Sequence, residues 1–429
     1  MNTLVIRNGR VVDPSQNLDE VCDIKIEDGK IAEIGSGLSG DEALDASGLV
    51  VAPGLVDMHV HLRDPGLTYK EDILSGCTAA AAGGVTSVVC MPNTKPAADR
   101  PEVIRYIIEK AGEASAKVYP AAAITMDLAG EEMTDFAALK KAGAVAVSDD
   151  GRPVESGAMM QKALERACAE GLLVTSHCED LRIIDGGIIH KGKASETLGV
   201  KGMDRSSEDS VTAREIALAA ATGTAVHIAH VSTRGSVALI RDAKARGVRV
   251  TAETAPHYFM LTDELLMKRD ADYRMNPPLR EQADCDAVLE GLLDGTLDCI
   301  VTDHAPHAPE EKADFLKAPN GVVGLETSFA ACATALVHTG KMSLAGLIRR
   351  MSENPARILG IPAGSLKAGM PADLALFDLD ECWTVDPDRF CSKSRNSVFK
   401  GMTLRGKIKY TLLDGRIVYR DHEEKGGAK

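Results

Sequence analysis

Eight short apolar segments recur through the middle of this chain, and helix-like stretches separate most of them. Strands that alternate with helices pair in parallel, and eight such units over roughly 300 residues are typical of a (β/α)₈ barrel. We therefore expect an α/β fold with a TIM barrel, and a doubly wound open sheet is the structural alternative. The segments cover residues 54–61, 85–91, 118–124, 144–148, 173–177, 225–231, 248–253 and 298–303.

The two stretches that flank these segments read as short β-strands joined by tight turns. Asn-Gly or Asp-Gly pairs occur at residues 8–9, 28–29 and 414–415, and such pairs are strong hairpin signals. Because chain ends often lie close together, we expect both stretches to form one small β-sandwich domain. The predicted boundaries are 1–52 and 365–429 for this domain, and 53–364 for the barrel.

Histidines concentrate at the ends of the apolar segments. His59 and His61 alternate on the first strand, so both side chains project to the same face. Neutral imidazole is a common metal ligand, and catalytic residues of a TIM barrel lie at the carboxyl ends of its strands. One or two metal ions are therefore expected there. Seven of the 11 histidines lie at or just past a segment end: His59, His61, His177, His230, His257, His304 and His307.

The alternation of side chains between the two faces of a strand also constrains which way four further residues point. Only one of Asp149 and Asp150 can face the barrel interior, and periodicity does not choose between them. His227 precedes His230 by three residues, so we expect it to face the opposite way and to pack toward the helices. Asp57 shares a face with His59 but lies deeper, which favours a role in supporting the ligands.

Other polar residues at the segment ends point to an anionic substrate. Asp303 ends the last segment, where it could accept a proton from a metal-activated water and pass it to a leaving group. Arg63 follows His61 by two residues, and its planar guanidinium suits a carboxylate. Asn93 and Asn276 add amide hydrogen bonds, so the substrate is expected to carry a carboxylate together with amide or urea groups.

Composition excludes several other classes of function. The net charge is −14, Lys and Arg form no dense run, and aromatic residues make up 3%, which argues against binding to nucleic acid. No apolar run reaches the ~18 residues of a membrane span, and the first ten residues lack the apolar core of a signal peptide. The ten cysteines form no Cys-x-x-Cys pair. We expect a cytoplasmic protein with reduced thiols and no membrane partner.

At the level of motifs, the chain resembles the dihydroorotases of the amidohydrolase superfamily, of the bacterial long-chain class I type. The resemblance extends over essentially the whole chain, including residues 368–373 of the small domain. It is carried by residues 59–66 (HVHLRDPG), 91–94 (MPNT), 275–280 (MNPPLR) and 302–307 (TDHAPH).

The resemblance implies zinc-dependent, reversible ring closure of N-carbamoyl-L-aspartate to L-dihydroorotate in pyrimidine synthesis. It implies one or two Zn²⁺ ions per subunit, with two favoured, and a bridging hydroxide as the nucleophile. His59, His61 and Asp303 would bind the first ion, His177 and His230 the second, and Asp150 would bridge them. Asp303 would double as general acid and base. The implied substrate-binding residues are Arg63, Asn93, Asn276, His307, Asn320 and Gly321.

Two rival functions stay open. Hydantoinases and allantoinases resemble this chain, but many of them bridge the metals with a carbamylated lysine on the fourth strand, and here Lys140 and Lys141 precede that strand. Some similar chains are inactive scaffolds for aspartate transcarbamoylase, and those typically lack the metal histidines. The resemblance also implies a homodimer and allows a complex with aspartate transcarbamoylase. We further expect residues 307–324 to close over bound substrate, because this polar stretch with Pro and Gly lies beside the pocket.

Overall fold

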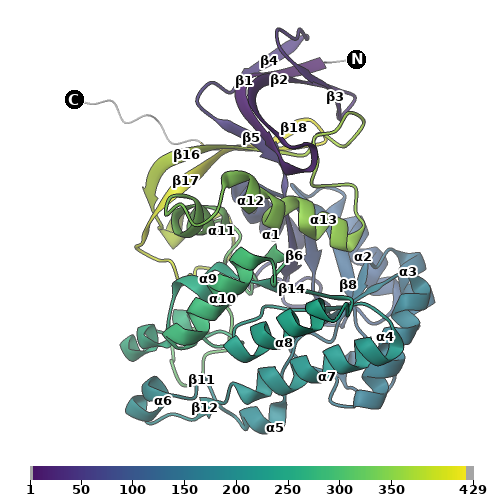
Figure 1. Cartoon of the computed structure of the whole chain (residues 1–429), viewed down its shortest axis with the longest axis vertical. Helices are drawn as coiled ribbons and strands as arrows, with labels where there is room; N and C mark the ends of the chain where they lie inside the picture. The colour runs from purple at the N-terminus through teal and green to yellow at the C-terminus, as the bar shows by residue number, and fades with distance from the viewer. Residues whose placement is uncertain (1–2, 422–429) are drawn as a thin grey trace.

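The chain is built around two large sheets, one at the upper end of the molecule and one below it, in the view of Figure 1. The computed structural model describes residues 3–421, and within that range each of the two sheets has eight strands. One sheet is the barrel, and the other, here called the terminal sheet, unites the first and last strands of the chain.

The barrel strands follow one another in chain order around the sheet, and every neighbouring pair is parallel. A bridge between Val60 and His304 joins the first strand to the last, which closes the barrel. An open doubly wound sheet would reverse its strand order, so the predicted TIM barrel is confirmed. The strands are β6 (Leu55–Val60), β7 (Val85–Cys90), β8 (Lys117–Ala122), β9 (Ala146–Val147), β10 (Leu173–Ser176), β13 (Val226–Ile228), β14 (Val250–Thr254) and β15 (Cys299–Ile300).

Several barrel strands are shorter than the apolar segments that predicted them. β9 spans two of the five residues expected, and β15 spans two of the six. The backbone leaves the sheet early and then adopts left-handed conformations, with φ of 32° at His230, 49° at Asp303 and 61° at Arg63. The side chains at the mouth of the barrel therefore do not follow the alternation of a strand.

Helices cover the outside of the barrel, and several begin at a residue that the sequence marks as a cap. Asp135 caps α3 by accepting from Ala138 N, and Thr233 caps α8 by accepting from Ser236 N. The helices are α1 (Ile73–Ala82), α2 (Pro101–Ala111), α3 (Phe136–Ala142), α4 (Gly157–Glu170), α5 (Leu181–Ile184), α6 (Lys193–Leu198), α7 (Ser206–Thr222), α8 (Arg234–Ala245), α9 (Pro256–Met260), α10 (Gln282–Asp294), α11 (Ser328–Cys332), α12 (Leu344–Ile348) and α13 (Asn354–Leu359). A two-stranded pair, β11 (Ile189–His190) and β12 (Gly202–Met203), lies beside α6.

The terminal sheet confirms the small β-domain predicted from both ends of the chain. Its central junction is β5 against β16, where an N-terminal strand pairs antiparallel with a C-terminal one. Figure 1 shows these purple and yellow strands together at the upper end of the molecule. The exact domain boundaries stay a prediction. The strands are β1 (Thr3–Asp13), β2 (Leu18–Glu27), β3 (Lys30–Gly35), β4 (Glu42–Asp45), β5 (Val50–Pro53), β16 (Leu374–Thr384), β17 (Thr403–Leu413) and β18 (Arg416–Arg420).

One of the three predicted hairpin turns is wrong. Asn8 and Gly9 lie inside the single strand β1, where the pairing with β2 shifts register between Ile6 and Gly9. The positive φ of 61° at Asn8 serves a β-bulge there rather than a turn. The pairs at residues 28–29 and 414–415 do connect β2 to β3 and β17 to β18.

The two sheets enclose separate apolar cores. The larger core lies between the barrel and its helices and extends to one side of the terminal sheet, and the smaller one lies within the terminal sheet. Among residues 3–421, no helix has the length and apolar character that a membrane crossing requires.

Candidate metal centre

Six buried side chains converge at the carboxyl ends of the barrel strands. His59 lies near the end of β6, and His61 lies just past it; each of the other four follows a different strand, so residues far apart in sequence meet at one place. Each of the six is at most 6% exposed. They are His59, His61, Asp150, His177, His230 and Asp303, which are the predicted metal ligands.

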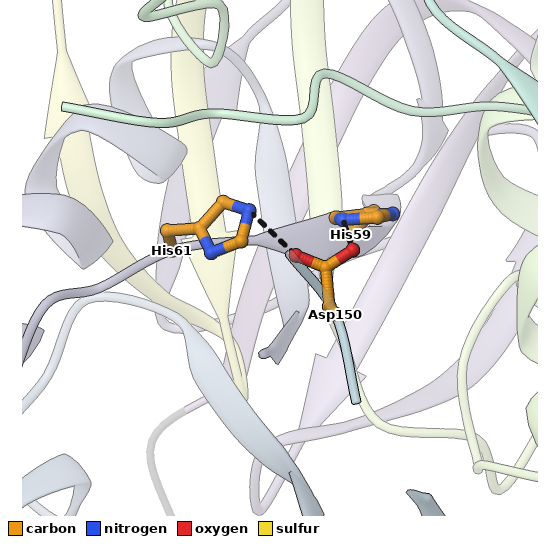
Figure 2. A group of neighbouring side chains, drawn as sticks. All are labelled: His59, His61 and Asp150. Atoms are coloured by element: carbon orange, nitrogen blue, oxygen red, sulfur yellow. Dashed lines mark ion pairs between the residues drawn. The ribbon is translucent and has the colours of Figure 1, made fainter. Parts of the chain in front are cut away.

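Asp150 and Asp303 face the two histidines of the first strand. His59 Nε2 lies 3.3 Å from Asp150 Oδ1, and His61 Nε2 lies 3.4 Å from Asp150 Oδ2 (Figure 2). Asp303 Oδ1 lies 3.1 Å from His61 Nε2 and 3.7 Å from His59 Nε2. These four side chains therefore surround one small volume.

A second group of ligand atoms lies on the other side of Asp150. His177 Nδ1 and His230 Nε2 are 2.7 Å apart, and they lie 3.6 and 3.7 Å from Asp150 Oδ1. The three atoms come close enough together to hold one ion. Asp150 stands between the two groups, which is the position of a bridging ligand.

Acceptors behind three of the histidines fix which ring nitrogen faces the centre. His59 Nδ1 lies 2.7 Å from Glu253 Oε1, and His61 Nδ1 lies 2.8 Å from Asn93 Oδ1. His177 Nε2 lies 3.0 Å from Glu179 Oε2. These oxygens can only accept, so each outward nitrogen carries a hydrogen and the inward nitrogen is left to ligate.

Two of the inward atoms lack hydrogen-bond partners. Within the described residues, His59 Nε2 and Asp150 Oδ1 are buried without a hydrogen bond. Buried polar atoms in folded proteins are nearly always satisfied, so such orphans indicate a missing ligand. The donor set of imidazole nitrogens and carboxylate oxygens suits a divalent transition metal such as zinc. The residues present therefore fit one or two metal ions.

The electrostatics of the cluster favour added positive charge. Burial would raise the pKa of Asp150, but the adjacent histidines His59, His177 and His230 hold that pKa well below its usual range. Burial opposes charge on His177 as well, yet hydrogen bonds to Asp150 and Glu179 raise its pKa to about 10. The centre thus attracts cations, whether as protons or as metal ions.

The structure separates the two adjacent aspartates. Asp149 turns away from the centre, and its carboxylate accepts from Ile124 N at 2.7 Å and Thr125 N at 3.1 Å, just past β8. Burial raises the pKa of Asp149 to about 6. Asp150 alone faces the histidines.

The expectation that His227 packs toward the helices is wrong. His227 Nε2 lies 3.1 Å from Glu253 Oε2, and Glu253 in turn holds His59 inside the barrel. The left-handed φ of 32° at His230 breaks the alternation that the prediction assumed. Asp57 lies below His59, accepting from His59 N and Thr302 N, each at 3.1 Å, so it braces β6 against the last strand.

A fork of donors lies beside the metal-ligand cluster. Arg63 Nη2 and His307 Nε2 are 3.5 Å apart, and His307 Nε2 donates to Asn320 O at 2.9 Å. Next to this carbonyl, Gly321 has a φ of 144°, and an added Cβ there would lie 2.8 Å from His307 Nε2. These four predicted substrate-binding residues therefore lie together.

The remaining predicted amides contact a metal ligand or the carboxylate behind one. Asn93 accepts from His61, as described above, and Asn276 Nδ2 donates to Glu179 Oε1 at 2.9 Å. Glu179 and Glu253 were not predicted to have a role. Their signal in the sequence is weak, since a carboxylate near a strand end is common, and only the fold shows that each backs a histidine.

Besides His307, two histidines of the predicted set lie outside the cluster. His304 Nδ1 accepts from Gly324 N at 3.2 Å, and its Nε2 lies 3.5 Å from Glu71 Oε2, so it fastens the last strand to the surrounding loops. His257 is buried at the start of α9, and burial lowers its pKa to about 4, although Asp303 opposes that shift.

A third histidine–carboxylate group, separate from the six ligands, does not suit a metal. His190, Glu281 and Asp284 place ligand atoms within 4.8 Å of one another. Arg280 Nη1 lies 3.2 Å from His190 Nδ1, so that nitrogen accepts and the other carries the hydrogen. Arg205 already pairs with both carboxylates at 2.8 and 3.3 Å. Two guanidinium groups thus supply the charge that a cation would bring.

Comparisons with known proteins agree with this geometry. A family model described as dihydro-orotase-like matches residues 48–236. The dihydroorotase of Geobacter metallireducens is 52% identical over 422 residues, covering 97% of this chain and 99% of the relative. That of Trichlorobacter lovleyi is 50% identical over 421 residues, with the same coverage. Among solved structures, an L-hydantoinase (dihydropyrimidinase) from Arthrobacter aurescens superposes with a TM-score of 0.89 at 27% identity, over 99% of this chain and 97% of that chain.

Proposed function

Because this chain belongs to the dihydroorotase family, we propose that it interconverts N-carbamoyl-L-aspartate and L-dihydroorotate, with loss or gain of water, as a step of pyrimidine synthesis. The observation that carries the proposal is the convergence of four histidines and two aspartates at the barrel mouth, next to the donor fork of Arg63 and His307. A cyclic amide that bears a carboxylate matches both halves of this site.

We propose zinc as the cofactor, with two ions per subunit. His59, His61 and Asp303 would hold one ion, His177 and His230 the other, and Asp150 would contact both. When bound, such ions supply Lewis-acid chemistry, which activates water and polarises a carbonyl. The orphaned inward atoms of His59 and Asp150 support this assignment.

Asp303 is the proposed general acid and base. Burial would raise the pKa of its carboxyl group, but the hydrogen bond from His61 and the nearby His59 keep that pKa below the usual value. The carboxylate is therefore ionised at neutral pH and accepts a proton from water in the direction of ring opening. It then returns this proton to the ring nitrogen as the carbon–nitrogen bond breaks.

Arg63 and His307 are proposed to hold the substrate carboxylate. Arg63 is buried, its Nε donates to Pro306 O at 3.2 Å, and its Nη2 lies beside His307 Nε2. A planar guanidinium fixed at one end presents its remaining donors in a set direction, which suits a carboxylate. Asn93, Asn276 and the backbone at Asn320 and Gly321 would complete the site with amide hydrogen bonds.

Hydantoin hydrolysis is the second candidate, because the chain superposes well on the L-hydantoinase from Arthrobacter aurescens and on a dihydropyrimidinase from Brevibacillus agri at a TM-score of 0.86. The bridging position distinguishes the two reactions. Residues 146–150 read AVSDD and offer aspartate but no lysine. An Arg63→Gln variant that loses turnover only of carboxylated substrates would count against a hydantoinase.

Turnover of L-dihydroorotate by the purified protein, with bound metal counted in the same sample, tests the proposal. We expect hydrolysis that stops on chelation and returns with Zn²⁺. Turnover of dihydropyrimidines or hydantoins in place of L-dihydroorotate would contradict it. Light scattering, alone and with an aspartate transcarbamoylase, tests the predicted homodimer and complex; the cytoplasmic location also stays a prediction.

A further inference from the structure

A lysine stands directly behind the histidine of the donor fork. Lys70 Nζ lies 3.2 Å from His307 Nδ1, on the side of the imidazole away from Asn320. Lys70 is 8% exposed, and its backbone N donates to Leu67 O at 3.0 Å while Ser394 Oγ donates to its carbonyl at 2.8 Å. The ammonium group is therefore held in place by the fold.

The two neighbours of His307 determine its protonation. An ammonium group can only donate, so Nδ1 must accept from Lys70 and cannot carry a hydrogen. A carbonyl oxygen can only accept, so Nε2 must carry the hydrogen that goes to Asn320 O. The ring is thus uncharged, with its N–H at Nε2, which lies 3.5 Å from Arg63 Nη2.

The charged groups around the ring explain what Lys70 prevents. Glu311 Oε2 lies 3.6 Å from His307 Nδ1, where it would stabilise a proton on that nitrogen. Lys70 occupies Nδ1 and also pairs with Glu311 Oε1 at 2.8 Å. Arg63 and Lys312 add further positive charge, and burial together with Arg63 and Lys70 lowers the pKa of His307 to about 3.

We propose that Lys70 is a positioning residue that keeps His307 as an uncharged Nε2–H donor beside Arg63. The inference rests on the proposed role of His307 in holding the substrate carboxylate, which would share the Nε2 hydrogen with Asn320 O. Its consequence is that the charge of the His307 ring stays constant across the physiological pH range. Without Lys70, His307 would take up a proton at Nδ1 and pair with Glu311.

The first test is ¹⁵N NMR of the full-length, metal-loaded protein with labelled histidine, in which the His307 signals are identified by their loss in His307→Gln. We expect the wild type to show the neutral Nε2–H form from pH 5.5 to 8.5. We expect Lys70→Met to show a ring that titrates within this range, and Lys70→Arg, which retains a donor, to behave as the wild type. An imidazolium or an Nδ1–H ring in the wild type would overturn the proposal, even if Lys70→Met does not fold.

The second test is the KM for L-dihydroorotate at pH 6 and pH 8.5. In Lys70→Met the KM is expected to be roughly 5- to 10-fold higher at pH 8.5 than at pH 6, since a charge-assisted hydrogen bond gives way to a neutral one. The ratio of the KM at pH 8.5 to the KM at pH 6 should be the same in Tyr69→Phe as in the wild type. This control variant loses the 3.0 Å hydrogen bond from Tyr69 to Glu311 but keeps Lys70 on His307.

The outcomes separate the inference from the proposed function. A folded Lys70→Met variant with unchanged His307 signals and an unchanged KM ratio would refute the role of Lys70. A wild type that shows the Nε2–H ring but does not turn over L-dihydroorotate would contradict the proposed function and leave the protonation of His307 as inferred.

Discussion

Asn276 and His177 share one carboxylate: Glu179 accepts from Asn276 Nδ2 at 2.9 Å through one oxygen and faces His177 Nε2 at 3.0 Å through the other. A predicted substrate contact is thereby tied to a predicted metal ligand. The arrangement also fixes the amide of Asn276, whose oxygen is left to accept from a substrate N–H. In the proposed roles of Asn276 and His177, this group would couple metal binding to substrate orientation.

Glu179→Gln is expected to weaken both functions, because a glutamine has one acceptor oxygen for two donors. Loss of a carboxylate behind a ligating histidine lowers metal affinity by roughly 10- to 100-fold. Competition with a zinc chelator measures this affinity, and the KM for L-dihydroorotate measures the orientation of Asn276. Glu155→Gln, which alters a glutamate with a half-exposed side chain, is the control. Unchanged affinity and KM in Glu179→Gln would contradict the coupling.

Asp303→Asn is expected to abolish turnover while at least one metal ion remains bound. The amide cannot accept a proton, so kcat should fall by about 10²- to 10⁴-fold. His177, His230 and Asp150 stay intact and retain a site. Stopped assays for kcat and elemental analysis of the same sample check the prediction. Near-full activity in this variant would refute the acid–base role.

Gly321→Ala is expected to raise the KM more than it changes kcat. The added Cβ would lie 2.8 Å from His307 Nε2 and 2.8 Å from Ala305 O, and the φ of 144° is one that alanine rarely adopts. We expect a destabilisation of about 1–3 kcal/mol together with displacement of the Asn320 carbonyl. Gly157→Ala is the matched control, since its Cβ would meet only Arg214 Cδ at 3.9 Å. Equal KM values in both variants would show that the backbone here is unimportant.

His190 makes the fold sensitive to acid. Burial and the charges of Arg280 and Arg205 lower the pKa of His190 to about 3, whereas its value in the unfolded chain is near 6.5. Between these pH values only the unfolded chain binds the proton. The contribution of His190 to the free energy of unfolding is therefore fully present above pH 6.5 and is lost as the pH falls. The loss at pH 5 is about 2 kcal/mol relative to neutral pH.

Urea unfolding at pH 7.5 and pH 5 measures this contribution. We expect His190→Gln to lose less stability between the two values than the wild type does. His338→Gln, at a partly buried histidine whose Nε2 faces Leu379 O, should lose as much as the wild type. Identical losses in all three proteins would show that His190 does not carry the effect.

The loop of residues 307–324 is expected to become protected when substrate binds. Its anchor in this structure is Lys312, whose Nζ donates to the carbonyls of Arg274, Pro319 and Gly321, each at 3.1 Å. The loop should therefore be cut faster in Lys312→Met than in the wild type by thermolysin, a protease that does not require lysine at the cleavage site. L-Dihydroorotate should slow cleavage of the wild type. Equal cleavage with and without substrate would contradict closure of the loop.

Much of the fold was predictable because it depends on order along the chain. Eight apolar segments separated by helix-like stretches determine a closed parallel barrel, and parallel strands bring their carboxyl ends to one edge. This is why His59, His61, His177 and His230 could be grouped from the sequence. To predict these site residues, it was enough that each lies at or just past the end of a strand.

The groups behind the ligands could not be predicted in the same way. Glu253 acts on a histidine from another strand, and their distance depends on how the barrel closes. Glu179 follows His177 by two residues, past the end of β10, where strand alternation no longer determines which way a side chain faces. The backbone is left-handed at His230 and Asp303, so side chains there no longer alternate between the two faces of a strand. The expectation for His227 assumed that alternation and was therefore wrong. Lys70 lies outside any strand, so no periodic pattern singles it out.

The junction of β5 with β16 imposes an order on biosynthesis. β5 emerges early from the ribosome, but its antiparallel partner follows only after residues 54–373 have been made. At ~5–20 residues per second, this delay lasts roughly 15 to 60 seconds. During that time one edge of β5 is open to pairing with other chains. A nascent chain that stalls within the barrel is therefore left with an exposed edge strand, and chaperone demand should peak before the last 60 or so residues are added.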